Sequence, residues 1–340
     1  MWDTNDYSLR RHNTFGLDVR CMRFAEYGSV EELRGLLAEL RECPVRRLLH
    51  IGGGSNLLFR ADFDGLVLHS GILDFDIVRT DGDAVYVRAG AGERWDDFVA
   101  WTVAMDLYGA ENLSLIPGEV GASAVQNIGA YGAEAKDIID SVEAIDVATG
   151  EVVHIPVAEC GYGYRTSRFK TKDAGRYIIL SVTYRLAQRF TPNLTYGGLR
   201  REVEARGIDP VDLTAADVRR IVIEVRRQKL PDPEVKGNAG SFFVNPIVSR
   251  DRFVDIWQHH PEMPSYDAGQ EVKIPAGWLV EQCGWRGRRL GPAGVYDRQA
   301  LVLVNEGGAT GADIVALSRA IQTDVCRQFG VWLQPEVMFV

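Results

Sequence analysis

Cysteine is scarce in this sequence, and none of it is clustered. Five of the 340 residues are cysteines, and the two nearest, Cys21 and Cys43, lie 22 residues apart. The lack of a CxxC pair excludes the common thiolate metal and redox motifs, and the odd, scattered count excludes a dense disulfide framework. We therefore expect reduced, mostly buried thiols in a cytoplasmic protein.

Long apolar runs, internal repeats and an excess of positive charge are also missing. No stretch approaches the roughly 18 apolar residues that span a bilayer, and residues 1–11 lack the apolar segment of a signal peptide. Acidic side chains (47) outnumber basic ones (38), for a net charge of -9. We therefore expect neither nucleic acid nor membrane insertion, whereas a local basic site for an anionic small molecule is compatible with this charge.

The length and the periodicity of apolar residues predict two or three α/β domains. Ser29 and Glu32 form a capping box before a helical apolar stripe. Strands are expected at 48–51, 66–68, 85–87, 142–147, 152–155, 177–186 and 337–340, and helices at 95–105, 214–228 and from Thr310 to Gly330. Pro231 and Pro233 mark a boundary after the second of these helices.

A cluster of glycines, GGGSN at 52–56, follows the strand expected at 48–51. Glycines allow main-chain N–H groups to approach a pyrophosphate, because no Cβ stands in the way. The spacing matches neither GxGxxG nor GxxxxGK[ST]. From these residues alone, a tight turn and a phosphate-binding loop are equally good interpretations.

A second glycine-rich segment, 116–132, has 17 residues, four glycines and one charge, Glu119. Ser123, Gln126 and Asn127 supply neutral hydrogen-bonding groups. Such a lining suits a large flat heterocycle with its own polar edge, such as a flavin. The alternative is a buried loop of small residues that packs two domains together.

Nine short motifs, in the same order along the chain, resemble the UDP-N-acetylenolpyruvoylglucosamine reductase family. They are NTFG (13–16), GGGSNLL (52–58), IPGEVGASAVQNIGAYG (116–132), YGYRTS (162–167), LTYG (194–197), KLPDP (229–233), GNAGSFFVNP (237–246), AGWL (276–279) and PEV (335–337). Each motif is modest alone, but chance does not order nine of them. The family reduces an enolpyruvyl sugar nucleotide with NADPH through FAD.

The resemblance implies an α+β fold. We expect two α/β FAD-binding subdomains of the vanillyl-alcohol-oxidase-like type (1–70 and 71–230), an α+β substrate-binding domain (231–325), and a C-terminal strand (326–340) that returns to the FAD-binding part with the catalytic glutamate. Tyr164 and the full-length third region are typical of the longer form of the family. The expected protein is a monomer that binds FAD noncovalently, NADPH as co-substrate, and a UDP-sugar.

Three residues are expected to be catalytic. Arg165 can bind a carboxylate bidentately and stabilise an enolate; Ser241, in a turn-rich segment, can give a proton to that enolate; Glu336 precedes an apolar strand, where an unpaired carboxylate is costly. The resemblance implies these roles. The alternatives are a surface arginine, a turn serine and a salt-bridged edge residue.

The resemblance also implies binding residues. Those expected at the flavin are Gly52, Gly53, Gly54, Ser55, Asn56, Pro117, Gly118, Gly121, Ala122, Ser123, Gln126, Asn127, Gly129 and Arg226. Those expected at the UDP-sugar are Tyr164, Tyr196, Lys229 and Asn245. The alternative for Arg226 is a solvated basic face, since Arg219, Arg220 and Arg227 are close in sequence. No metal site is expected.

Two other functions remain open at this point. One is an FAD-dependent oxidase or dehydrogenase of the same superfamily, and the other is a flavin-binding protein without turnover. The presence of all three catalytic candidates argues against both. The sequence also departs from several relatives of the long form, which carry an arginine where this chain has Met338 and continue beyond the position of Val340.

Overall fold

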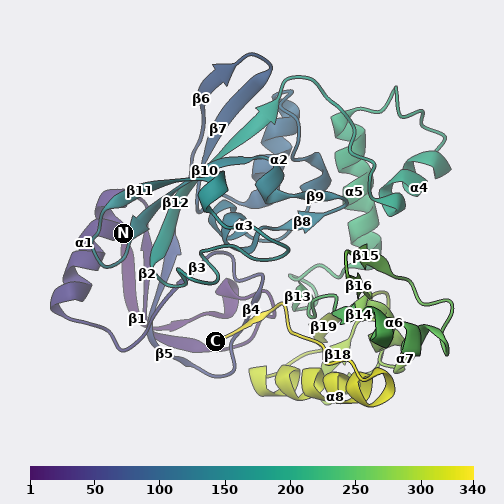
Figure 1. Cartoon of the computed structure of the whole chain (residues 1–340). Helices are drawn as coiled ribbons and strands as arrows, with labels where there is room; N and C mark the ends of the chain where they lie inside the picture. The colour runs from purple at the N-terminus through teal and green to yellow at the C-terminus, as the bar shows by residue number, and fades with distance from the viewer. The chain divides into compact units, whose positions relative to one another are not determined.

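The chain contributes three separate stretches to each of two units in the computed structural model, which describes residues 1–340 (Figure 1). The first unit comprises Met1–Tyr7, Cys21–Gly53 and Asp64–Arg226, and the second comprises Ser8–Arg20, Gly54–Phe63 and Arg227–Val340. The chain thus changes unit after Tyr7, Arg20, Gly53, Phe63 and Arg226. The domain boundaries expected from the sequence stay a prediction.

The first unit begins with a four-stranded sheet of order β1-β2-β5-β3. Its strands are β1 (Trp2–Ser8), β2 (Arg20–Tyr27), β3 (Leu48–Ile51) and β5 (Phe63–Ser70), with β3 and β5 parallel. Helix α1 (Val30–Glu42) buries Leu33, Leu36 and Leu37 in one core cluster with β2 and β5. The same cluster includes Ile178 and Leu180 of the neighbouring sheet, so the core beneath α1 contains residues of both sheets.

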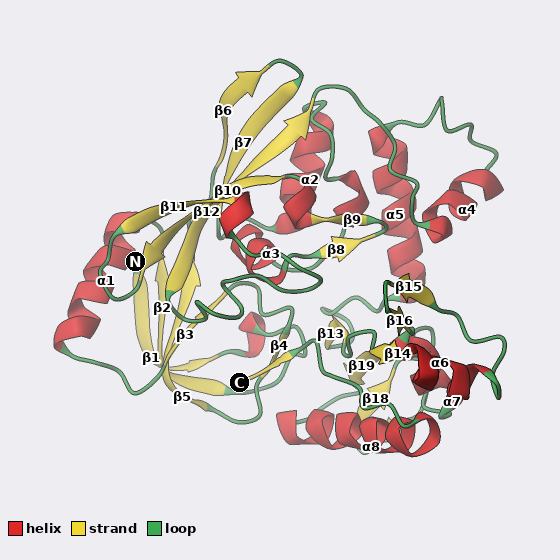
Figure 2. Ribbon diagram, in the orientation of Figure 1, coloured by secondary structure: helices red, strands yellow, loops and turns green.

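The second sheet of this unit is antiparallel, with order β11-β10-β12-β7-β6. Its strands are β6 (Phe75–Asp81), β7 (Ala84–Gly90), β10 (Ile139–Asp146), β11 (Val152–Pro156) and β12 (Tyr177–Ala187). Helices α2 (Trp95–Ala104) and α3 (Val120–Gln126) lie beside it (Figure 2). Their buried side chains, such as Phe98 and Ala124, pack with Val182 and Tyr184 of β12.

Helices α4 (Gly197–Ala205) and α5 (Ala215–Lys229) form a separate small core around Leu199 and Ile221. The remaining elements of this unit are short: strands β8 (Gly129–Ala130) and β9 (Ala133–Glu134), and 3₁₀ helices at Glu111–Leu113, Ala135–Asp137 and Val157–Glu159. Helix α5 ends at Lys229, shortly before the prolines at 231 and 233, as those prolines predict.

The second unit holds two small sheets, β13-β19-β18-β17 and β14-β16-β15. Their strands are β13 (Asn238–Ser241), β14 (Ile247–Ser249), β15 (Tyr266–Ala268), β16 (Glu271–Lys273), β17 (Arg289–Leu290), β18 (Ala293–Val295) and β19 (Val302–Asn305). The helices are α6 (Arg250–Trp257), α7 (Ala276–Gln282), α8 (Gly311–Phe329) and a 3₁₀ helix at Arg10–His12. Strand β4 (Leu57–Leu58) pairs in parallel with the last strand, β20 (Met338–Phe339).

The ends of two helices confirm what the sequence predicts. Thr310 caps α8 in a capping box with Asp313, and Gly330 closes the helix at φ 63°. Ser29 caps α1 by accepting from the N–H of Glu32, but the predicted capping box forms only in part, because the Glu32 carboxylate accepts from the N–H of Gly28 at 2.8 Å instead of from that of Ser29. None of the helices combines the length and apolar character needed to cross a bilayer.

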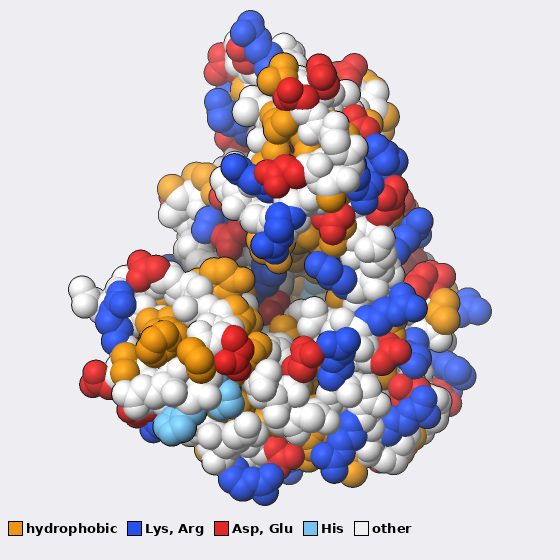
Figure 3. All heavy atoms as spheres, turned by 90° about the vertical axis from the view of Figure 1, so that its right-hand side faces the viewer, with side chains coloured by type: hydrophobic (Ala, Val, Ile, Leu, Met, Phe, Trp, Pro, Cys, Tyr) orange, Lys and Arg blue, Asp and Glu red, His pale blue; other side chains and the backbone are white.

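The mixed charge of the surface agrees with the composition, whereas the burial of the cysteines differs from what we expected. On the face drawn in Figure 3, Lys and Arg side chains are interspersed with Asp and Glu side chains. All five cysteines are free. The expectation of mostly buried thiols is wrong, because only Cys21 and Cys160 are buried and Cys43 is exposed.

Candidate active site

The two glycine-rich segments meet in the first unit. A Cβ at Gly52 would lie 3.1 Å from Glu119 Oε2 and 3.2 Å from Ala122 Cβ, and one at Gly53 would lie 3.5 Å from Gly118 Cα. The N–H groups of Gly52 and Gly53 donate no hydrogen bond within the protein. Both glycines are partly exposed. The turn therefore presents two unused main-chain donors beside the second glycine segment.

Residues 54–56 belong to the second unit and contact other segments of it. Gly54 has φ +65°, and a Cβ there would collide with the carbonyl of His12. Its own carbonyl accepts from Thr14 N at 3.3 Å. Asn56 donates its side-chain amide to the Glu336 carbonyl at 3.2 Å, and its carbonyl accepts from Met338 N at 3.0 Å. Gly54 and Asn56 thus hold the main chain of this unit in place. Contact with a cofactor would be a further role of the same residues.

The 116–132 segment contains a short helix, α3, which its sequence does not predict. Its three neutral polar side chains have partners inside the protein. Ser123 Oγ donates to the Val120 carbonyl at 2.6 Å, and Gln126 Oε1 accepts from the Lys170 ammonium at 2.7 Å. Asn127, at φ 48°, donates to the Gly163 carbonyl at 2.8 Å. These side chains fix the shape of the segment around the helix.

Arg165 adopts a conformation that favours glycine, with φ +56°. Its guanidinium donates to the Gly129 carbonyl at 2.5 Å, and a Cβ at Gly129 would lie 2.8 Å from Arg165 Nη1. The half-exposed Tyr164 ring lies 5.3 Å from the guanidinium carbon. The structure thus brings Arg165, Tyr164 and the 116–132 segment together.

Ser241 and Glu336 belong to adjacent segments of the second unit. Ser241 is exposed at the end of β13, after Gly240 at φ +66°. The Glu336 N–H donates to the Phe242 carbonyl at 2.8 Å, and Phe243 forms an isolated antiparallel β-bridge with Pro335. Asn245 Oδ1 accepts from Ala276 N at 2.9 Å, at the start of α7.

The other predicted binding residues lie at the ends of α4 and α5. Tyr196 precedes α4, is half-exposed, and makes an edge contact with Tyr131, their ring centroids 5.6 Å apart. Lys229 is the exposed last residue of α5. Arg226 is partly buried and donates through Nε to the Leu115 carbonyl at 3.1 Å. Burial lowers the pKa of Arg226, and the like charge of Arg165 acts in the same direction.

A carboxylate–imidazole–carboxylate group lies next to the glycine turn, and the sequence did not predict it. His69 on β5 contacts Glu26 through Nδ1 at 2.8 Å and Glu119 through Nε2 at 2.9 Å. Burial opposes the charged form of His69, but hydrogen bonds and charge from Glu119 and Glu26 prevail and raise its pKa. Only the isolated charge of Glu119 in a neutral segment could have pointed to this group.

Comparisons with known proteins agree on one family. Residues 23–156 match the model described as FAD binding domain, and residues 232–340 match that of UDP-N-acetylenolpyruvoylglucosamine reductase, C-terminal domain. The UDP-N-acetylenolpyruvoylglucosamine reductase of Bacteroides fragilis (strain YCH46) is 52% identical over 98% of this chain and 99% of its own length. A reductase of the same name from Burkholderia ambifaria (strain MC40-6) is 50% identical over 98% and 96%.

A solved structure shows the same fold. The UDP-N-acetylenolpyruvylglucosamine reductase of Thermus caldophilus has a TM-score of 0.69 to this chain at 20% identity, covering 99% of this chain and 98% of its own. Together with the FAD-binding match, this likeness confirms the predicted α+β fold class.

Proposed function

Because this chain belongs to the UDP-N-acetylenolpyruvoylglucosamine reductase family, we propose that it reduces UDP-N-acetylglucosamine enolpyruvate to UDP-N-acetylmuramate, a step in making peptidoglycan precursors. NADPH is the electron donor. The C-terminal family match favours this activity over the oxidase and over a binding protein without turnover. We place the enzyme in the cytoplasm, in line with its free cysteines. We further propose that it acts as a monomer.

The residues of the first unit fit a bound flavin nucleotide. The turn at Gly52 and Gly53 offers two N–H donors without a Cβ, as a diphosphate requires. Gly118, at φ +117°, lets the second segment approach that turn closely. FAD, held here noncovalently, supplies a carrier for the hydride that NADPH gives up and the substrate's terminal enolpyruvyl carbon receives.

Arg165 is the group that we assign to the substrate carboxylate. Hydride addition to the terminal carbon leaves negative charge on the adjacent, carboxylate-bearing carbon, as an enolate. A guanidinium stays protonated and can hold both carboxylate oxygens. The bond from Arg165 to the Gly129 carbonyl fixes its direction before substrate binds, so little reorganisation is needed when charge develops.

Ser241 and Glu336 are the groups that we assign to proton transfer. Ser241 donates its hydroxyl proton to the carboxylate-bearing carbon, and Glu336 polarises the enol. The observation that supports this pair best is the hydrogen bond between Glu336 N and the Phe242 carbonyl. We further assign Lys229 to the diphosphate of the UDP-sugar and Tyr164, Tyr196 and Asn245 to its other parts.

An anaerobic visible spectrum tests the function directly. The purified protein should show flavin bands that NADPH bleaches and that UDP-N-acetylglucosamine enolpyruvate restores. Bleaching without recovery would reject this substrate and leave another oxidoreductase activity. Absence of any flavin after addition of FAD would reject the cofactor site itself.

A further inference from the structure

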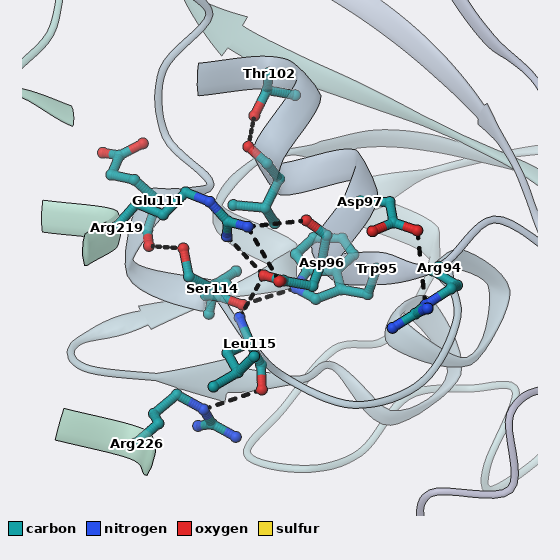
Figure 4. Close-up of polar contacts among 12 residues, drawn as sticks. Arg94, Trp95, Asp96, Asp97, Thr102, Glu111, Ser114, Leu115, Arg219 and Arg226 are labelled. Carbon is teal, nitrogen blue, oxygen red and sulfur yellow. Dashed lines mark hydrogen bonds and ion pairs between the residues drawn. The ribbon is translucent and has the colours of Figure 1, made fainter. Parts of the chain in front are cut away.

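Leu115 is held from both sides by charged side chains in a main-chain conformation that is uncommon outside glycine. Its φ is +57°. Its N–H donates to Asp96 Oδ1 on α2 at 2.5 Å, and its carbonyl accepts from Arg226 Nε on α5 at 3.1 Å (Figure 4). Such a conformation persists when its surroundings determine it. Leu115 directly precedes the 116–132 segment, so the start of that segment is fixed by two helices.

Asp96 has a second partner, Arg219, also on α5. Arg219 Nη1 lies 2.6 Å from Asp96 Oδ1 and Nη2 lies 3.1 Å from Oδ2, so the pair is bidentate. The side chains are only 17% and 23% exposed. Hydrogen bonds from Arg219 and Leu115 outweigh burial and lower the pKa of Asp96, which therefore stays a carboxylate.

Arg219 and Arg226 are two helical turns apart, on one face of α5. Arg219 satisfies the charge of Asp96. Arg226 uses only Nε, and its two terminal nitrogens have no partner in the protein. The three side chains carry a net charge of +1, and the unpaired positive group is Arg226. This differs from a solvated basic face, in which both arginines would point to water.

We propose that Asp96 and Arg219 are positioning residues for the flavin: Asp96 holds Leu115, and Arg219 keeps Asp96 from pairing with Arg226, whose guanidinium is thereby left to face the bound flavin. The proposal rests on the proposed function, because it requires flavin at the 116–132 segment. Arg226 is the other cation whose charge acts on Asp96, so it is the partner that loss of Arg219 would leave for Asp96.

The flavin reduction potential of the holoprotein, measured by equilibration with redox dyes, tests this charge balance. Arg219→Gln removes one positive charge and should lower the potential, because reduced flavin carries negative charge. Asp96→Asn removes one negative charge and should raise it. The double variant should return close to the wild-type potential. A purely structural role predicts no shift, or shifts of the same sign.

FAD affinity, measured by adding FAD to apoprotein, gives a second readout. Arg219→Gln should weaken binding about tenfold, as loss of a charge-assisted bond predicts. Arg219→Lys keeps the charge and should preserve the potential while weakening binding less. Arg220→Gln is the matched control, because Arg220 is exposed and pairs at 2.8 Å with Asp217. It should change neither quantity.

The outcomes separate this proposal from the proposed function. If wild-type protein binds FAD and the single variants shift its potential in the same direction, or not at all, the positioning role is wrong and the function stands. If wild-type protein binds no FAD, both fail. Thermal unfolding of each variant shows whether it is folded, and Asp96→Asn, which should raise the potential, keeps the test open if Arg219→Gln does not fold.

Discussion

Glu336 donates its main-chain N–H to the carbonyl of Phe242, the residue that follows Ser241. Two expected catalytic residues, 95 positions apart in the sequence, are thereby tied to neighbouring segments of one unit. Asn56 reinforces the arrangement through its bond to the Glu336 carbonyl. A change in either segment should therefore alter the placement of both functional groups.

Ser241→Ala should separate the two half-reactions. Reduction of the flavin by NADPH should keep its rate, whereas reoxidation by the enolpyruvyl sugar should slow about 10²–10⁴-fold, the range for loss of a positioned proton donor. Stopped-flow absorbance of the flavin bands measures both. The control is Ser249→Ala, which removes a helix cap in the same unit. Unchanged reoxidation in Ser241→Ala would remove Ser241 from the mechanism.

Arg165→Lys should lower kcat while leaving flavin bound. A lysine keeps the charge but cannot hold a carboxylate with two parallel bonds, so we expect a loss of about 10²-fold or more. Steady-state kinetics with the enolpyruvyl sugar measure it. Arg168→Lys is the matched control, since Arg168 pairs with Asp173 at 2.6 Å. Equal losses in both variants would indicate a general loss of structure.

Gly54→Ala should destabilise the second unit. The substitution places a Cβ at φ +65° and against the His12 carbonyl, and we expect a loss of about 2–4 kcal/mol in unfolding free energy. Gly291→Ala has a similar φ of +60° with open space around it. It should cost about 1 kcal/mol. Denaturant unfolding compares them, and equal costs would contradict the role of the His12 contact.

Two histidines on neighbouring strands should give stability a maximum near neutral pH. Burial lowers the pKa of His50 to about 3, so its contribution is present above the unfolded pKa and is lost as the pH falls from about 6.5, by at most roughly 1.4 kcal/mol per pH unit. The raised pKa of His69 works oppositely, since its contribution is present below about pH 6.5 and is lost as the pH rises through the folded value.

Thermal unfolding from pH 5 to 8 checks this behaviour. His50→Gln should flatten the acid side of the profile, and His69→Gln should flatten the alkaline side. The charged groups facing His69 are Glu26 and Glu119, and the Tyr27 hydroxyl faces His50 at 2.8 Å. A profile that neither variant changes would show that other groups set the pH dependence.

The helices that the sequence predicts are those whose signals are local. Helix α8 has an apolar stripe, a Thr310 cap and a closing glycine, all readable over a few residues. Helix α3 gave no such signal, because its glycine has low helix propensity and its stability comes from packing Val120 and Ala124 into the core.

The charged residues that shape the candidate site could not be found from sequence because their partners are distant. Asp96 and Arg219 are 123 residues apart, and Glu119 lies 50 residues from His69. A basic run on a helix suggests a solvated face, yet Arg219 is only 17% exposed. The nine family motifs include the glycine segments and Arg165, whereas His69, Asp96 and Arg219 lie outside those motifs.

The pairing of β4 with β20 has a consequence for how this protein is made. Leu57 lies opposite Met338, so the ribosome adds the partner of β4 long after β4 itself. Strand β4 must therefore wait without its strand partner until Met338 and Phe339 have been added. A release of the nascent chain before residue 338 would leave β4 unpaired, whatever the state of the preceding helices.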